Sequence, residues 1–376
     1  MESYTYASPS AAPGNKRALT VRKYGPPDTG PQVYIQASLH GDEIPGMLVA
    51  HHLESLLASS DAAGQLNATV TVVPYANPIG ISQRIHGAVM GRLDLDTGRN
   101  FNRYYPDLRE AVATRIKGLL TASEEENETT IRAAIAHELD QREPKSEQEW
   151  LRCKLMKLAQ GADYCIDLHC DTEAVMHMYS GPSRSDDVQV LANLLECQAL
   201  MIEKVSGGHP FDESLSGVWR HIRQQFPEHP VGEGTMGCTV ELRGQGDVSD
   251  SVARQDAENL FQFLVEIGVA NGTKRDIPFS CEPTPLDGVE YIEAPSAGII
   301  AFSVLPGDVV SKNQTIGTII NPEHIGDASR QEVFSTIDGV VFSRENQRLV
   351  APGQIIMAIA GRESIKGRAG SHLLSD

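Results

Sequence analysis

The chain of 376 residues is 40% hydrophobic and 22% charged, which is the composition of an ordinary globular protein. Its formal net charge of −18 argues against a nucleic acid as partner, because surplus acidic groups repel the phosphates. The length favours two domains over a single core. We find no signal-peptide pattern and no apolar run of the roughly 18 residues that a membrane span needs. The six cysteines form no close pairs in the sequence, which indicates a reducing compartment, and we expect a cytoplasmic protein. Since the sequence has no membrane span, we expect no membrane partner.

The predicted elements, taken in chain order, indicate an α/β fold. Residues 1–16 are rich in Ser, Pro, Ala and Gly, which predicts a loose arm. Residues 33–39 alternate between apolar and polar side chains, as a strand does. A helix over 46–59 and a strand over 69–75 follow at the spacing of a βαβ unit. Further predictions are mostly helical structure over 107–160, strands over 164–169, 174–179 and 238–242, and a helix over 251–267.

The composition changes near the end of the chain. Residues 271–287 are rich in proline and turn-forming residues and predict a linker. Beyond it, two pairs of segments resemble each other about 40 residues apart, and neither copy could bury its apolar side chains alone. We therefore expect a catalytic α/β domain over residues 17–275 and a small C-terminal β-sandwich domain over 288–362. The paired segments are 297–300 with 338–341, and 310–316 with 350–356.

A possible metal site begins at the sequence His-Gly-Asp-Glu, which follows the first strand of the predicted βαβ unit. His40 and Glu43 lie three positions apart, with glycines and a proline nearby to turn the chain. His169 and Glu241 each end a further predicted strand. Catalytic zinc takes three such ligands and keeps one position open for water. Strand ends also meet at one edge of an open α/β sheet, so the pattern favours a zinc hydrolase with one free carboxylate.

Each of these residues also has an ordinary structural explanation. A His-x-x-Glu pair occurs by chance in many chains, and a single histidine at a strand end is usually just hydrogen bonded. Glu241 could form an ion pair with the nearby Arg243. Cys170 competes with its neighbour as a ligand, but adjacent strand residues face opposite ways. His86 and His177 are expected to be structural or substrate-adjacent rather than ligands.

Taken together, the motifs resemble the succinylglutamate desuccinylase/aspartoacylase family, within the zinc carboxypeptidase-like group. The resemblance covers roughly residues 30–270, and residues 290–361 resemble the β-domain that follows in this family. It implies a carboxypeptidase-like mixed central sheet flanked by helices, plus a small all-β sandwich similar to a barrel-sandwich hybrid. The motifs that match, in order, are His40-Gly41-Asp42-Glu43, Asn77-Pro78, Asn102-Arg103-Tyr104-Tyr105-Pro106, Asp167-Leu168-His169 and Glu241.

The resemblance also implies a role for each matching residue. His40, Glu43 and His169 would bind one zinc ion. Glu241 would be the catalytic general base and acid. The implied reaction is hydrolysis of the amide bond of an N-acyl amino acid, or a similar small N-acylated amine, by Glu241-assisted attack of zinc-bound water. The enzyme could form a homo-oligomer.

For the substrate, the resemblance implies that Asn102 and Arg103 bind a carboxylate, which a planar guanidinium can grip through two hydrogen bonds. A further arginine upstream would polarise the scissile carbonyl. Arg92 is our choice and Arg84 is the rival. The chain departs from the family at residues 100–101, where Asn-Phe replaces the usual Asp-Leu. This difference weakens any inference about the particular substrate.

Two other functions fit the sequence less well. A zinc metallocarboxypeptidase that acts on small peptides would use the same metal site. A non-catalytic metal-binding or carrier-type protein is the third possibility, because the C-terminal repeat is similar to biotinyl/lipoyl carrier domains. Such a carrier needs a modifiable lysine on the turn between its halves, and residues 321–334 contain no lysine.

Overall fold

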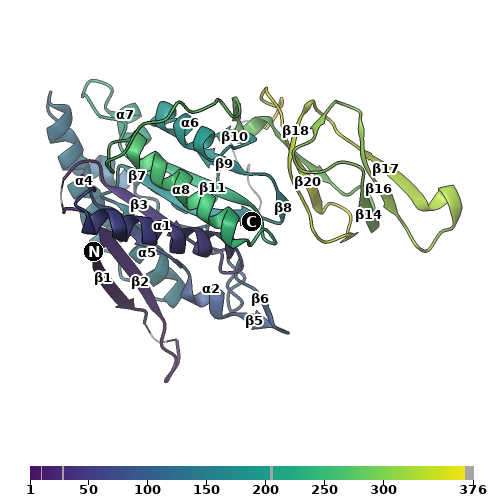
Figure 1. Ribbon diagram of the computed structural model, residues 1–376, viewed down its shortest axis with the longest axis horizontal. Coiled ribbons are helices and arrows are strands. Elements are labelled where there is room, and N and C mark those ends of the chain that lie inside the picture. The colour runs from purple at the N-terminus through teal and green to yellow at the C-terminus, as the bar shows by residue number, and fades with distance from the viewer. Residues whose placement is uncertain (10, 28, 204–205, 369–376) are drawn as a thin grey trace.

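A nine-stranded mixed β-sheet forms the centre of the larger part of the molecule (Figure 1). The structure is a computed structural model and describes residues 1–9, 11–27, 29–203 and 206–368. The four central strands run parallel, and antiparallel neighbours follow on both sides. In spatial order the strands are β1 (Glu2–Ala7), β2 (Ala18–Tyr24), β4 (Val70–Val73), β3 (Val33–Ala37), β7 (Tyr164–Asp171), β11 (Met236–Gly244), β9 (His177–Ser180), β10 (Ala199–Ile202) and β12 (Pro283–Pro285).

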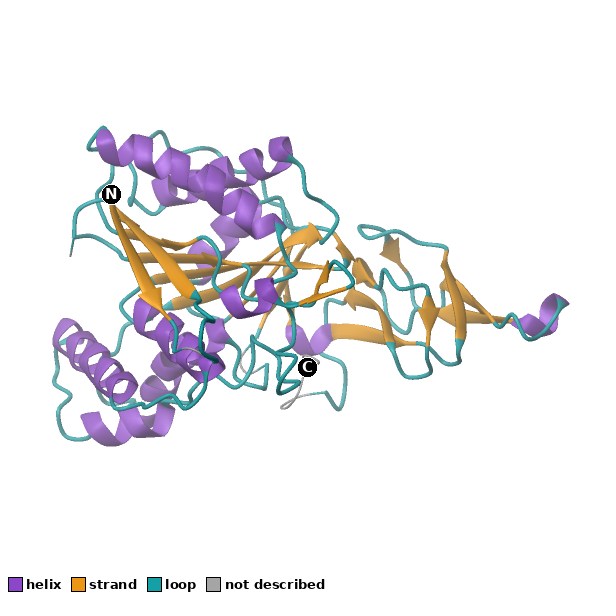
Figure 2. Ribbon diagram, turned by 90° about the horizontal axis from the view of Figure 1, so that it is seen from below, coloured by secondary structure: helices purple, strands orange, loops and turns teal. Residues whose placement is uncertain are grey.

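Helices cover both faces of this sheet, as Figure 2 shows. Each group of helices shares a buried apolar cluster with one face. None of the helices in the described ranges combines the length and apolarity needed to span a lipid bilayer. One face carries α1 (Pro45–Ala62), α6 (Ser185–Leu194) and α8 (Asp250–Glu266). The other carries α3 (Arg109–Ile116), α4 (Glu124–Asp140), α5 (Glu147–Ala159) and α7 (Phe211–Gln225).

Strand alternation decides which side chains of the central strands can form a site. Leu168 on β7 and Val240 on β11 lie in the apolar cluster shared with α1, α6 and α8. Because successive strand residues point to opposite faces, Asp167, His169 and Glu241 point to the other side. β7 and β11 are adjacent and parallel, so these polar residues gather at the carboxyl ends of two neighbouring strands. The predicted α/β sheet with flanking helices is confirmed.

The C-terminal strands form two small antiparallel sheets around their own apolar cluster, which confirms the predicted β-structure. The two sequence repeats occupy equivalent places, because each copy supplies three consecutive strands that alternate between the sheets. One sheet contains β13 (Val289–Glu293), β20 (Ile355–Ala360), β18 (Gly339–Arg344) and β15 (Val309–Val310). The other contains β17 (Arg330–Phe334), β16 (Thr315–Ile320), β14 (Gly298–Phe302) and β19 (Leu349–Val350).

A short strand joins these C-terminal strands to the central sheet. β8 (Glu173–Ala174) follows β7 directly and pairs with β18. The Glu173 carboxylate accepts hydrogen bonds from Arg344 (2.7 Å) and Arg348 (2.7 Å). The remaining short elements are α2 (Pro78–Ser82), β5 (Arg84–Ile85), β6 (Ala88–Val89) and the 3₁₀ turns Leu286–Gly288 and Gly326–Ser329.

Two predictions based on composition are wrong in part, and residue 10 of the first segment lies outside the described residues. Residues 1–16 are not simply a loose arm, because β1 pairs with β2 along its whole length. The Lys154 ammonium also lies 3.3 Å from the ring centroid of Tyr6 in β1. Likewise, the predicted linker over 271–287 contains β12, which pairs with β10 and extends the central sheet. β1 pairs with the next strand along the chain, whereas β12 is held by a partner distant in sequence, which local composition cannot reveal.

Candidate metal centre

The chain turns sharply after β3 and brings Glu43 back beside His40. Ser38 adopts a positive φ of 55°, and its hydroxyl donates a hydrogen bond to the Glu43 carbonyl oxygen at 2.8 Å. The turn lies directly on the segment that follows α2, because the Gly41 N–H donates to the Gly91 carbonyl oxygen at 2.9 Å. A Cβ on Gly41 would lie only 2.3 Å from a backbone nitrogen of α2. Only glycine therefore allows this approach.

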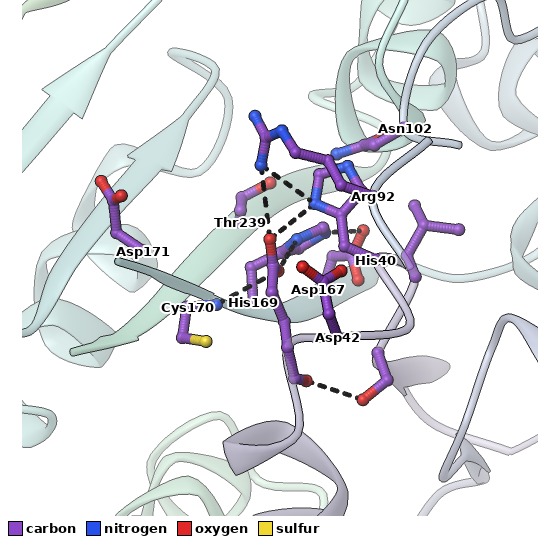
Figure 3. Close-up of polar contacts among 12 residues, drawn as sticks. His40, Asp42, Arg92, Asn102, Asp167, His169, Cys170, Asp171 and Thr239 are labelled. Carbon is purple, nitrogen blue, oxygen red and sulfur yellow. Dashed lines mark hydrogen bonds and ion pairs between the residues drawn. The ribbon is translucent and has the colours of Figure 1, made fainter. Parts of the chain in front are cut away.

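The three predicted ligands come together at one point, and Figure 3 shows the two histidines, His40 and His169, side by side. Nδ1 of His40 lies 2.7 Å from Oε1 of Glu43, and Nδ1 of His169 lies 2.7 Å from Oε2 of the same carboxylate. Their ligand atoms all lie within 4.8 Å of one another. The exposed fractions of the three residues are 4%, 3% and 2%. A buried carboxylate between two imidazoles is an arrangement that could hold a metal ion.

Each histidine has a second partner on the far side of its ring. Nε2 of His40 lies 2.9 Å from Oδ1 of Asn100, and Nε2 of His169 lies 3.0 Å from Oδ2 of Asp167. Such partners fix the ring orientation and leave Nδ1 free for a metal. Two imidazole nitrogens and one carboxylate oxygen are donors that zinc favours. The residues present therefore fit a zinc ion.

Sequence reasoning had missed these two supporting residues. In the sequence, Asn100 stands out only as a departure from the family, and Asp167 only as part of a motif. The position of Asp167 two residues before His169 was a usable signal, because such residues share a strand face. The contact between His40 and Asn100 spans 60 positions and leaves no local pattern.

The electrostatics of the centre suit a cation. Burial alone would raise the pKa of Glu43, but the two facing imidazoles hold it well below its usual range. Burial lowers the pKa of His40. The pKa of His169 is raised despite burial, because the carboxylates of Asp167 and Glu43 flank the ring. The carboxylates of Asp167 and Glu43 on either side of the His169 ring favour a positive charge in this pocket, and a metal ion would supply one.

Arg92 lies at this centre and Arg84 does not. Nη1 of Arg92 is 3.4 Å from Oε1 of Glu43 and 3.5 Å from Nδ1 of His40, while 47% of its side chain is exposed. The neighbouring Gly91 packs against the turn between His40 and Glu43 and accepts the Gly41 N–H. This contact fixes the position of the Arg92 backbone beside the ligands. The exposed Arg84 instead donates to the carbonyl oxygen of Gly87 within its own hairpin. Of the two arginines, Arg92 is the one that contacts the ligand residues within the described part of the chain.

Glu241 lies next to His169 on the adjacent strand. The two residues are direct register partners in the parallel pairing of β7 and β11. Burial, and then the charge of Glu43, raises the pKa of Glu241 to about 8. Its Oε2 is buried and has no hydrogen-bond partner in the described part of the chain. Arg243 pairs with Asp256 instead, so the alternative of a Glu241–Arg243 ion pair is wrong.

Asn102 and Arg103 are both buried and form hydrogen bonds within the protein. Oδ1 of Asn102 accepts the N–H of Phe211 at the start of α7, at 2.9 Å. Nη1 of Arg103 donates to the Asn102 carbonyl oxygen at 2.8 Å. Asn102 therefore fastens α7 to the loop that carries Arg103. Their role as substrate ligands stays a prediction.

A mixed sheet with helices on both faces, and a His-Glu-His cluster at its strand ends, defines a carboxypeptidase-like α/β protein. The sequence model of the succinylglutamate desuccinylase/aspartoacylase catalytic domain matches residues 29–267. The chain therefore belongs to the succinylglutamate desuccinylase/aspartoacylase family, as predicted. A comparison with curated protein sequences gave no match.

Solved structures with the same fold include two from Shewanella, both described as succinylglutamate desuccinylase/aspartoacylase proteins. The Shewanella amazonensis protein is 23% identical, with a TM-score of 0.87 over 96% of this chain and 98% of that one. The Shewanella frigidimarina protein is 22% identical, with a TM-score of 0.86 over 96% and 97%. The ectoine utilization protein of Ruegeria pomeroyi is 16% identical, with a TM-score of 0.63 over 96% and 95%. At these identities the likeness shows a shared fold.

Proposed function

We propose that this protein is a zinc-dependent amidohydrolase that removes the acyl group from an N-acyl amino acid or a similar small N-acylated amine. The observation that carries this proposal is the buried His40–Glu43–His169 cluster with Arg92 and Glu241 beside it. Membership of a family named for desuccinylase and acylase activity supports hydrolysis of an amide rather than another reaction.

The protein side of the reaction follows from the two groups beside the ligands. When bound, zinc supplies a Lewis acid that lowers the pKa of a water molecule and withdraws electrons from a carbonyl. Glu241 takes a proton from the attacking water and delivers it to the leaving nitrogen. A carboxyl group whose pKa lies near neutrality is suited to both transfers. Its unpaired, buried oxygen is available for this proton because the strand offers it no other partner.

Arg92 would stabilise the negative charge that develops on the carbonyl oxygen. Its long contact with Glu43 and its half-exposed side chain leave it able to turn toward a substrate. Such a preorganised donor is typically worth about 3–4 kcal/mol in the transition state. Arg103 would bind a carboxylate of the substrate, with Asn102 holding its loop against α7.

The domain organisation supports a small substrate. We propose that residues 17–275 form the catalytic domain and residues 288–362 the β-domain. The second unit has its own apolar cluster, and β8 pairs with it two residues after β7 ends. This pairing attaches the β-domain just beyond the end of β7, the strand that carries His169, and from there it would exclude long chains. The free cysteines, five of them buried, support a reducing compartment such as the cytoplasm.

A substrate panel tests the proposal directly. We expect the zinc-loaded protein to hydrolyse N-acyl amino acids faster than dipeptides. Replacing the carboxyl in Glu241→Gln should lower kcat about 100- to 10,000-fold, because proton transfer is lost. Glu258→Gln makes the same chemical change at an exposed position of α8 and should leave kcat unchanged. Full activity of Glu241→Gln would contradict the mechanism, and preference for dipeptides would favour a carboxypeptidase.

A further inference from the structure

A buried carboxyl group at the end of β10 has no role in the proposed mechanism. Glu203 directly follows the strand, and its N–H donates to the Ser180 carbonyl oxygen at 2.9 Å, which continues the pairing of β10 with β9. Only 4% of the residue is exposed. Its Oε2 is buried and has no hydrogen-bond partner within the described residues. Because a buried carboxyl group normally has a partner, this one needs an explanation.

One face of α7 lies opposite this carboxyl group. Glu213, Gly217 and Arg220 are three or four positions apart on the helix and therefore share a face. Both Glu213 and Arg220 interact electrostatically with Glu203, which places this face against the end of β10. The Glu213 carboxylate is already engaged, because its Oε2 accepts the N–H and the hydroxyl of Ser206. The helix thus brings a second carboxyl group close to Glu203, as well as a guanidinium.

Two buried glycines leave room beside the carboxyl group. Gly181 directly follows Ser180 at the end of β9, and Gly217 lies in the middle of α7. A Cβ on Gly217 would lie no closer than 3.7 Å to a neighbouring side chain, and one on Gly181 would meet only the Ser216 hydroxyl, also at 3.7 Å. Neither glycine has a positive φ, so the backbone does not require one there. A glycine inside a helix is destabilising relative to alanine, which indicates that the space at Gly217 has a use.

Glu203 also lies near the predicted substrate-binding groups. Arg103 interacts with it electrostatically from the loop that docks on the start of α7. Asp212, at the start of that helix, interacts with it as well, and its Oδ2 accepts the Thr239 hydroxyl at 3.2 Å. Thr239 comes two residues before Glu241 on β11 and therefore points to the same face of the sheet. The surroundings of Glu203 thus continue into those of the metal centre.

The sheet register gives the separation between this carboxyl group and the proposed general base. Ser180, which accepts the Glu203 N–H, is the register partner of Cys238 on β11. Cys238 comes three residues before Glu241, which corresponds to about 10 Å along the strand at a rise of about 3.3 Å per residue. An extended diamino acid such as lysine, with its acylated nitrogen at the metal centre, would span most of this separation.

The missing partner of Glu203 is a group with positive charge. Burial, and then the charges of Asp212 and Glu213, raise the pKa of Glu203, and a nearby cation would reverse that effect. We propose that Glu203 binds a free ammonium group of the substrate, which is therefore an N-acylated amine with a second, unacylated amino group. An ammonium group donates strong hydrogen bonds to a carboxylate, while Arg103 would bind a carboxylate of the same molecule. This inference rests on the proposed function.

Two substrates that differ only in the ammonium group test this inference on the wild type. We expect kcat/KM to be about 10- to 100-fold higher for Nα-acetyl-lysine than for Nα-acetyl-norleucine, which has the same chain without the ammonium group. Nε-acetyl-lysine and mono-acetylated diaminopentane complete the panel, because one moves the free ammonium group and the other lacks the carboxylate. A preference for any of these three over the norleucine compound supports the inference and identifies the kind of substrate. No such preference would overturn it.

Glu203→Gln removes the negative charge but keeps the shape of the side chain. We expect kcat/KM of this variant to fall about 10- to 100-fold for the ammonium substrate and to stay unchanged for the norleucine compound. A purely structural role would lower both values together, and such a parallel fall would overturn the inference. Glu258→Gln makes the same change at an exposed position of α8 and should keep the wild-type preference.

Titration calorimetry of the zinc-loaded protein separates this inference from the proposed function. We expect free lysine to bind the wild type about tenfold or more tightly than norleucine, and the two to bind Glu203→Gln with equal affinity. Equal affinities in the wild type would overturn the inference. If the wild type hydrolyses no acyl compound, the proposed function fails, and the calorimetry alone decides whether Glu203 binds an ammonium group.

Discussion

The two faces of the central sheet are built from the same strands but serve different ends. The face under α1, α6 and α8 is covered by a continuous apolar cluster to which every central strand contributes. The opposite face is apolar under α3, α4, α5 and α7, and then becomes polar where β7 and β11 end. At the ends of β7 and β11, the second face therefore has buried charged side chains where the first face has apolar ones. We therefore expect substitutions at adjacent residues of one strand to have different effects. A residue on the polar face should affect zinc binding and activity, and its neighbour on the apolar face should affect stability.

The largest effect should come from removing a ligand on the polar face. His169→Ala leaves only His40 and Glu43 at the centre, so we expect zinc no longer to bind stoichiometrically and hydrolysis to fall to background. Elemental analysis after dialysis, together with kcat on the best acyl substrate, measures both losses. Stoichiometric zinc in this variant would show that the ion is held elsewhere.

The neighbouring residue on the same strand should show the opposite pattern. Leu168→Ala removes a fully buried side chain from the apolar face and should lower the free energy of unfolding by about 2–5 kcal/mol. Urea denaturation of the metal-free protein measures this loss. Zinc binding should persist below the transition, since the ligands lie on the other face. A variant that kept its stability but lost zinc would contradict the division between the faces.

A buried acid on the polar face should make stability depend on pH. Burial, and then the charge of Glu213, raises the pKa of Asp212 to about 6, and its Oδ2 accepts the Thr239 hydroxyl at 3.2 Å. The folded protein therefore binds this proton more tightly than the unfolded chain. As pH rises from 4 to 7 the unfolded state ionises first, so this group lowers stability by roughly 2–3 kcal/mol.

Asp212→Asn should remove that part of the pH dependence. We expect the difference in unfolding free energy between variant and wild type to shift in favour of the variant between pH 4 and pH 7. Chemical denaturation at a series of pH values measures it, with Asp186→Asn, at an exposed position in the first turn of α6, as the control. Parallel pH curves for Asp212→Asn and the wild type would disprove the assignment.

The smallest effect should come from the support of a ligand. Asn100→Ala removes the acceptor that orients His40 and should weaken zinc about 10- to 100-fold. Asn100→Asp keeps an acceptor oxygen and should bind zinc at least as well as the wild type. Competition with a chelator measures both affinities. Unchanged affinity in the alanine variant would mean that Asn100 only holds its own loop.

The parts of the site that could be read from the sequence are those that local rules determine. Strand alternation and the glycine turn after His40 make the three candidate ligands and Glu241 visible in the sequence, and the order of the family motifs then groups these distant residues into one candidate site. The choice between Arg92 and Arg84 depended on how a loop packs on the ligand turn. Contacts between segments far apart, such as that of Asn100 with His40, leave no pattern in the chain.

The same limit applies to the fold. The βαβ unit can be predicted from the periodicity of its apolar residues, and the C-terminal strands can be predicted from their repeated segments. The strand over residues 2–7 is harder to identify, because this edge strand is largely exposed and is stabilised by backbone pairing with β2 rather than by a buried apolar face. Asn102 is a similar case, since its bond to the backbone of α7 is visible only once the helix is in place.

The pairing of β8 with β18 also bears on the order in which the protein is made. It joins residues 173 and 344, so the segment that follows His169 leaves the ribosome long before its partner strand exists. At a synthesis rate of about 5–20 residues per second, that segment waits on the order of ten seconds. His177 likewise stays uncovered until Phe342 arrives. The surroundings of the metal centre are therefore among the last parts of the nascent chain to be completed.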